Sequence, residues 1–173
     1  MLPMLTNFTL QKQSLANLCW AACVASAASW LRQRPVAECD VVDRTLHASP
    51  SCCGQSLSYH AYSPCNNRQV VSDALKAVGH YGGDHYGWPS LLELQNQDAL
   101  QRPVVLVVQW LDGGSAVAHA MVLAGVDQSA GVPTLRLLDP NPRAVAPPIA
   151  PMSYADVQTY LPAIGAYTVL TSP

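Results

Sequence analysis

The spacing of hydrophobic positions changes partway along the chain. Before residue 103, apolar side chains recur at helical spacing between stretches rich in Ser, Pro, Asn and Gly. One stretch is alanine-rich, contains no Gly or Pro, and is apolar on almost every face, which is typical of a buried helix. The pattern predicts four helices, at Cys19–Arg32, Val36–His47, Arg68–Val78 and Ser90–Leu100.

After residue 102 the pattern is that of β-strands, with short runs rich in β-branched residues. The predicted strands are Pro103–Trp110, His119–Asp127, Thr134–Asp139 and Ala166–Thr171, with a short helix at Ser153–Leu161. Loops are expected at 48–67, Gly79–Pro89 and Pro140–Pro151, the last with five prolines. Because helices come first and strands second, we expect one α+β domain over residues 1–173, with its sheet in the C-terminal half.

Composition narrows the possible functions. The 173 residues are 50% hydrophobic and 12% charged, which fits a globular domain with a full core. The formal net charge is −2 and the chain has two lysines, so no basic surface for nucleic acid is expected. The sequence contains no phosphate-binding glycine loop and no paired acidic motif for a metal. We therefore expect neither a metal nor a cofactor.

The N-terminal residues show no positive leader, long apolar stretch or small-residue cleavage site, so we predict no signal peptide. The longest nearly apolar run, Cys19–Leu31, is too short to span a bilayer. If the chain is exported, it would therefore use an unconventional route, or an export signal that lies on another part of a larger precursor or has been removed.

Cys19 stands at the first position of a predicted helix, next to Trp20. A helix start presents unpaired backbone N–H groups and the positive end of the dipole, which favour a thiolate and lower a cysteine pKa. We expect Asn17 to cap this helix end. The alternative is a structural cysteine that only packs, and the presence of partner residues decides between the two.

A thiolate nucleophile needs a base, and the base needs an orienting group. His119 opens a predicted strand, where its side chain can project into a cleft. Asp139 ends the next strand, and an antiparallel pairing of the two strands would bring it beside His119. Asn141 is a second candidate for the orienting role. The alternatives are a polar strand end for His119 and a turn-forming Asp-Pro for Asp139.

Acyl transfer also needs hydrogen-bond donors for an oxyanion. The backbone N–H of Cys19 is one candidate donor, and the side chain of Gln13 on the preceding loop is the other. Without the remaining residues, Gln13 would be interpreted as a solvated loop residue.

The segment QSLANLCWAAC, residues 13–23, resembles the active-site region of papain-like cysteine peptidases. More narrowly, CWAAC, the cysteines at 39, 52–53 and 65, and the segments PVVLVVQW, HAMVLAGVD and LLDP resemble a group of bacterial papain-like proteases. That group includes secreted proteases and effectors that pathogens deliver into plant cells. The resemblance spans about residues 13–140, and four motifs in the right order are far more specific than one.

The resemblance implies a papain-like fold, in which the cysteine helix packs against an antiparallel sheet that carries the histidine and the aspartate. By motif position it implies a nucleophile at Cys19, a general base at His119, an orienting residue at Asp139 and an oxyanion donor at Gln13. One departure is the stretch GGSAVAH, because the group is expected to have Gly-Gly directly before the histidine. This departure bears on the substrate cleft rather than on the triad.

Six cysteines are present, and Cys23, one turn after Cys19 in the same apolar helix, is most simply a buried thiol. Zinc fits the other four poorly, because adjacent cysteines point apart and no CxxC spacing occurs. Two disulfides fit better and indicate an oxidising destination, such as the periplasm or the outside of the cell, whereas four free thiols are the alternative. The spacing leaves two pairings open, Cys39–Cys52 with Cys53–Cys65 or Cys39–Cys53 with Cys52–Cys65.

The sequence thus predicts a cysteine peptidase that hydrolyses protein or peptide substrates through an acyl-enzyme. A small disulfide-bearing domain of this kind suits a secreted bacterial effector or toxin, for which a cognate inhibitor or immunity protein is a plausible partner. The same triad also serves amidases, deamidases and transamidases, for example on peptidoglycan peptides. A non-catalytic binding module on a protease scaffold is a third hypothesis, against which the intact set of site residues argues.

Overall fold

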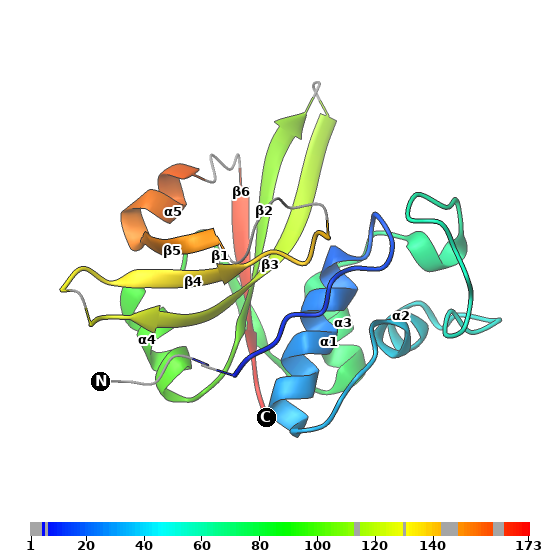
Figure 1. Ribbon diagram of the computed structural model, residues 1–173, viewed down its shortest axis with the longest axis horizontal. Coiled ribbons are helices and arrows are strands. Elements are labelled where there is room, and N and C mark those ends of the chain that lie inside the picture. The colour runs from blue at the N-terminus through cyan, green and yellow to red at the C-terminus, as the bar shows by residue number, and fades with distance from the viewer. Residues whose placement is uncertain (1–4, 6, 113–114, 130, 143–148, 161–164) are drawn as a thin grey trace.

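The structure, a computed structural model, describes residues 5, 7–112, 115–129, 131–142, 149–160 and 165–173 (Figure 1). The helices are α1 (Cys19–Arg32), α2 (Glu38–Leu46), the 3₁₀ turn η1 (Pro64–Asn66), α3 (Val71–Val78), α4 (Leu91–Ala99) and α5 (Tyr154–Tyr160). The strands are β1 (Tyr81–Tyr86), β2 (Val104–Asp112), β3 (Ser115–Asp127), β4 (Thr134–Leu138), β5 (Ile149–Ser153) and β6 (Gly165–Thr171). No helix in these ranges is long and apolar enough to cross a membrane.

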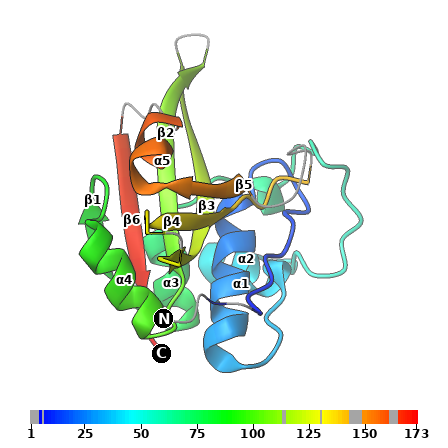
Figure 2. The same ribbon diagram turned by 60° about the vertical axis from the view of Figure 1, so that its left-hand side comes forward.

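The strands form one antiparallel sheet in the order β1-β6-β2-β3-β4-β5. The C-terminal strand β6 therefore lies inside the sheet, between β1 and β2. Helices α1, α2 and α3 cover one face, and α4 and α5 lie on the other (Figures 1 and 2). This arrangement confirms the predicted α+β class, with the cysteine helix packed on the sheet.

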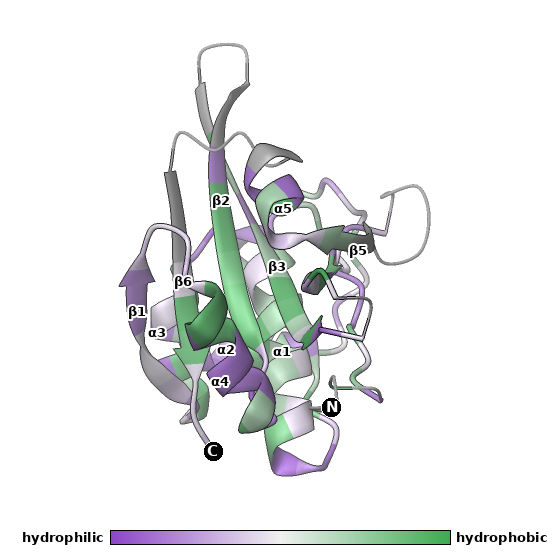
Figure 3. Ribbon diagram, turned by 90° about the vertical axis from the view of Figure 1, so that its left-hand side faces the viewer, coloured by the Kyte–Doolittle hydropathy of each residue, from purple (hydrophilic) through white to green (hydrophobic). Residues whose placement is uncertain are grey.

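Successive side chains of β2 point to opposite faces of the sheet, so this strand contributes to the hydrophobic core on each face. Val105 and Val107 pack into the core under α1, α2 and α3. Leu106 and Val108 pack with α4 and α5 into the other. The hydropathy view shows β2 and β3 as the apolar centre of the sheet (Figure 3). The position of α1 is therefore fixed by burial against the strand that also faces the candidate site.

One predicted loop is wrong. The stretch Gly79–Pro89 contains β1, which pairs with β6 at the edge of the sheet. Its glycines indicated a loop, but at Gly82 an added Cβ would lie 2.9 Å from the backbone of Thr171. The next residue, Gly83, has φ 136° and sits at a break in the register. These glycines serve close backbone approach and a bulge, two uses that glycine has inside strands.

Two further boundaries differ from prediction. Strand β3 begins at Ser115, so His119 lies within the strand and faces Val108 across the β2–β3 ladder instead of opening the strand. The end of the predicted proline loop belongs to β5 (Ile149–Ser153), which pairs with β4. In both cases pairing with a neighbouring strand, β2 for β3 and β4 for β5, extends the ladder beyond what local propensity indicates. Residues 113–114, which carry the Gly-Gly departure, lie outside the described residues.

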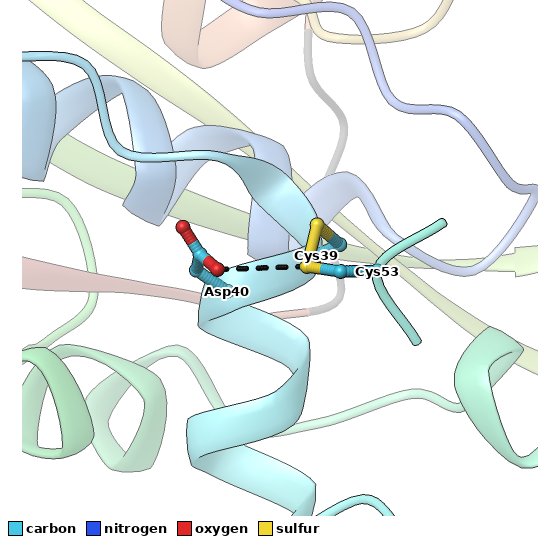
Figure 4. Close-up of side chains that lie close together, drawn as sticks. All are labelled: Cys39, Asp40 and Cys53. Atoms are coloured by element: carbon cyan, nitrogen blue, oxygen red, sulfur yellow. Dashed lines mark hydrogen bonds between the residues drawn. A yellow bond between two sulfur atoms is a disulfide. The ribbon is translucent and has the colours of Figure 1, made fainter. Parts of the chain in front are cut away.

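Two disulfides join the irregular segment 51–67 to the helices and to itself. They pair Cys39 with Cys53 and Cys52 with Cys65, which is one of the two pairings left open by the sequence. Figure 4 shows Cys39, Cys53 and Asp40 together, with Cys53 Sγ 3.5 Å from Asp40 Oδ1. Both sulfurs are consumed in the disulfide, so this cluster offers no thiolate to a metal.

Asp98 on α4 is a buried carboxyl group away from the candidate site. Its side chain is 3% exposed, and neither oxygen has a regular hydrogen-bond partner among the described residues. Burial raises the pKa of Asp98 to about 6, although the nearby backbone N–H of Val126 opposes the shift. The folded state therefore favours the protonated acid, and this contribution to stability is lost as pH rises from about 4 to above 6.

We expect Asp98→Asn to stabilise the protein at pH 8 by about 2 kcal/mol and to have much less effect at about pH 4, where the wild-type carboxyl is protonated. The amide has nearly the shape of the carboxyl group and carries no charge at either pH. Urea unfolding at several pH values measures the difference. Asp73→Asn, on an exposed pair with Lys76, is the control. Parallel pH–stability curves for wild type and Asp98→Asn would contradict the assignment.

Candidate active site

A large open cavity lies where α1, α3, β1 and the β2–β3 hairpin meet. Its volume is about 870 Å³, and its lining includes Cys19, His119 and Asp139. The rest of the lining mixes apolar groups such as Val70 and Val107 with polar side chains. The structure thus brings together three of the four predicted site residues in one open cavity.

Cys19 is the first residue of α1, as predicted. The residue before it, Leu18, is the N-cap and offers no side-chain hydrogen bond. The predicted cap at Asn17 is therefore wrong, because the Asn17 amide is directed elsewhere: its Nδ2 donates to the backbone oxygen of Asn66 at 2.8 Å. The backbone N–H groups of the first turn can therefore donate to the Cys19 thiolate or to a group bound in the cavity.

His119 and Asp139 come from adjacent antiparallel strands, as predicted. Strand β3 carries His119, and Asp139 follows the last residue of β4. His119 Nε2 donates to Asp139 Oδ1 at 2.8 Å, which leaves Nδ1 for Cys19. Asn141, the second candidate, contributes its backbone N–H, which donates to the same Asp139 oxygen at 2.7 Å.

The electrostatics of the three groups favour a charged pair. Burial opposes a thiolate, but the hydrogen bond and charge of His119 and the backbone N–H groups of Ala120 and Trp20 outweigh it, so the pKa of Cys19 is lowered. Burial likewise opposes an imidazolium, yet hydrogen bonds to Asp139 and Cys19 raise the pKa of His119 to about 9. Asp139 keeps a lowered pKa despite burial, chiefly through its hydrogen bond to His119. The lowered pKa of Cys19 and the raised pKa of His119 both favour a thiolate beside an imidazolium.

Cys23 provides the contrast within the same helix. It is fully buried, and its pKa is raised well above the ordinary value, first by burial and then by the charge of Cys19. It is a structural thiol, as the sequence predicts.

The segment before α1 holds the loop that carries Asp139. Lys12 Nζ donates to the backbone oxygens of Asp139 at 3.0 Å and Asn141 at 3.3 Å. The backbone N–H of Gln13 donates to Pro140 O at 2.9 Å. The sequence carries no signal for this role of Lys12, because its partners are backbone atoms far along the chain and form no motif.

Gln13 is 4% exposed and is not among the residues that line the described cavity. Its Nε2 lies within hydrogen-bond distance of three acceptors, Leu15 O, Ala16 O and Tyr59 Oη, while its Oε1 has no partner among the residues that the structure describes. In this conformation Gln13 therefore holds the loop that leads to Cys19. Its predicted role as an oxyanion donor stays a prediction.

Residues 3–147, most of the chain, match the family model described as "Papain-like cysteine protease AvrRpt2". The matched range includes all four predicted site residues. No curated protein matches the chain.

The ion pair makes a direct prediction for thiol chemistry. Near neutral pH, iodoacetamide should alkylate Cys19 at least about tenfold faster in wild type than in His119→Ala, because the variant loses the partner that stabilises the thiolate. Mass mapping of alkylated peptides gives both rates, with buried Cys23 as the internal control. His47→Asn, a change of an exposed histidine, should leave the rate unchanged. Equal rates in wild type and His119→Ala would contradict the pairing.

Proposed function

The chain belongs to the papain-like cysteine protease family of AvrRpt2, and we propose that Cys19, His119 and Asp139 form its catalytic triad. The observation that supports this most directly is the hydrogen-bonded chain from the Cys19 sulfur through the imidazole to the carboxylate. Family membership gives cysteine peptidase activity, and therefore a protein or peptide substrate. The assignment of residues to roles is our proposal.

In the first half of the proposed reaction, the Cys19 thiolate attacks the carbonyl carbon of a bound peptide. The carbonyl π electrons move to oxygen, and the backbone N–H of Cys19 donates to the oxyanion. His119, protonated in the resting pair, gives its proton to the amine as the C–N bond breaks. The products are an amine and a thioester on Cys19.

In the second half, neutral His119 takes a proton from water as that water attacks the thioester. The thioester carbon–sulfur bond breaks, the acid is released, and the thiolate–imidazolium pair is restored. Asp139 keeps the imidazole in one tautomer and orientation through the bond to Nε2, and it does not take the proton itself.

Gln13 is our candidate for the second oxyanion donor. Gln13 lies six residues before Cys19, and its NH₂ group donates to the backbone oxygen of Ala16, three residues before Cys19. We propose that one of its N–H bonds is exchanged for the substrate oxyanion. The buried, unpartnered Oε1 supports this, since an amide held at one end only is easier to turn than one bonded at both ends.

We further propose that the enzyme acts outside a reducing cytosol, as a secreted bacterial effector or toxin. The two disulfides support this, because such bonds persist in oxidising compartments. A toxin of this kind requires a cognate inhibitor or immunity protein in the producing cell. Directing the chain to the periplasm of a competing bacterium tests the idea, since growth unaffected by the active enzyme contradicts it.

The triad assignment predicts how peptide hydrolysis responds to three substitutions. Against an unfolded protein substrate, Cys19→Ala should lower kcat/KM at least about a thousandfold. Asp139→Asn keeps a hydrogen-bond acceptor but removes the charge, so the pKa of His119 falls and the alkaline limb of the pH–rate profile moves to lower pH. Asp139→Ala should lose more activity than Asp139→Asn.

Initial rates over a pH series measure these effects. Asp127→Asn is the control, because Asp127 is exposed and caps a turn at Ser129. An alkaline limb that stays in place in Asp139→Asn, or substantial activity in Cys19→Ala, would refute the assignment.

A further inference from the structure

The loop at residues 51–67, which the Cys52–Cys65 disulfide ties together, contacts the chain just before and just after Cys19. We propose that Asn66, which the Cys52–Cys65 disulfide fixes in place, is a positioning residue for Cys19. Turnover then depends on that disulfide as well as on a free nucleophile thiol. The inference rests on the proposed function and adds a residue and a bond to its machinery.

Asn66 is 6% exposed and uses all of its polar groups. Its Oδ1 accepts from the Asn17 backbone N–H at 2.9 Å, and its backbone oxygen accepts from the Asn17 amide at 2.8 Å. Its own Nδ2 donates to Ala61 O at 2.8 Å. The two bonds to Asn17 fix the backbone two residues before Cys19, and the third bond locks the Asn66 side chain.

Other bonds from the same loop surround the nucleophile. The Ala16 backbone N–H donates to Tyr59 O at 2.7 Å, before Cys19 in the chain. The Trp20 indole Nε1 donates to Asn67 O at 2.9 Å, directly after it. Because α1 has no side-chain cap of its own, these bonds come from outside the helix and set where its first turn begins.

The loop has little apolar burial to hold itself in place. Within residues 51–67 the buried residues are Cys52, Cys65 and Asn66. Two of these three are the halves of one disulfide, and the third is the positioning residue next to it. Packing alone is therefore a weak restraint on this loop, and the covalent bond keeps Asn66 against Asn17.

A dithiol reductant tests the bond chemically. It supplies two electrons and two protons, the Cys52–Cys65 bond becomes two thiols, and the reductant closes to its cyclic disulfide. Cys19 is already a free thiol and is not consumed. A mispositioned first turn costs turnover, because the oxyanion donor on Cys19 must lie at hydrogen-bond distance from the reacting carbonyl.

The first experiment compares Asn66→Ala with Gln55→Ala, an exposed amide in the same loop. Asn66→Ala should lower kcat at least about tenfold with KM within about twofold, since oxyanion contacts act in the transition state. Alkylation of Cys19 by iodoacetamide needs no oxyanion donor, so its rate and pH profile should stay within about twofold of wild type. Gln55→Ala should match wild type in all of these measurements.

The second experiment removes each disulfide in turn. Cys52→Ala/Cys65→Ala should lose at least about tenfold in kcat and become insensitive to dithiothreitol, whereas wild type loses activity in the reductant. Cys39→Ala/Cys53→Ala, which leaves the bond beside Asn66 intact, should lose less than about threefold. Mapping of alkylated Cys23 reports any global unfolding, because that thiol reacts only when the core opens.

Each outcome has one interpretation. Wild-type kcat in Asn66→Ala, or in Cys52→Ala/Cys65→Ala, overturns the positioning role. Slow kcat accompanied by fast alkylation of Cys23 also overturns it, since the loss is then one of folding. Wild type that neither hydrolyses peptides nor alkylates rapidly at Cys19 shows instead that the proposed triad is wrong.

Discussion

The site depends on one constraint: the partly buried segment that leads to Cys19 must find partners for its backbone N–H groups. Four of them are satisfied by three separate parts of the chain: the loop after β4, helix α2 and the segment 51–67. The partners are Pro140 for Gln13, Glu38 for Ser14, Tyr59 for Ala16 and Asn66 for Asn17. Of these partners, Pro140 lies next to Asp139, and Asn66 lies next to the disulfide-bonded Cys65. The backbone hydrogen bonds of this short segment thus connect the start of α1 to the loop that carries Asp139 and to the segment 51–67.

A second constraint is that burial and hydrogen bonding shift the pKa values of Cys19 and His119 in opposite directions. Burial alone would make Cys19 an ordinary thiol, as it does for Cys23 one turn further along α1. The difference is His119, which is hydrogen-bonded to the Cys19 sulfur through one ring nitrogen and to Asp139 through the other. The start of α1 supplies a backbone N–H that points at the sulfur, and the β3–β4 hairpin supplies the positive charge of His119. Neither element would activate the thiol by itself.

Much of this could be predicted from sequence because it is local. The helix beginning at Cys19 and the two antiparallel strands, one carrying His119 and the other ending just before Asp139, follow from local residue patterns. The strand β1 was missed because its glycines serve bulge and close approach, which only the partner strand β6 reveals. Asn66 and Lys12 were missed for a related reason: their partners are backbone atoms far away in sequence, and such contacts leave no spacing to detect.

We propose that Cys19 rests as a thiolate paired with the His119 imidazolium. The ultraviolet absorbance of the thiolate, followed through a pH titration with Cys19→Ser as the baseline, measures this directly. We expect the thiolate absorbance of wild type to appear at a pH below the ordinary cysteine range, and to move up by at least about one pH unit in His119→Ala. A wild-type signal that rises only in the ordinary range, unchanged by His119→Ala, would contradict the account.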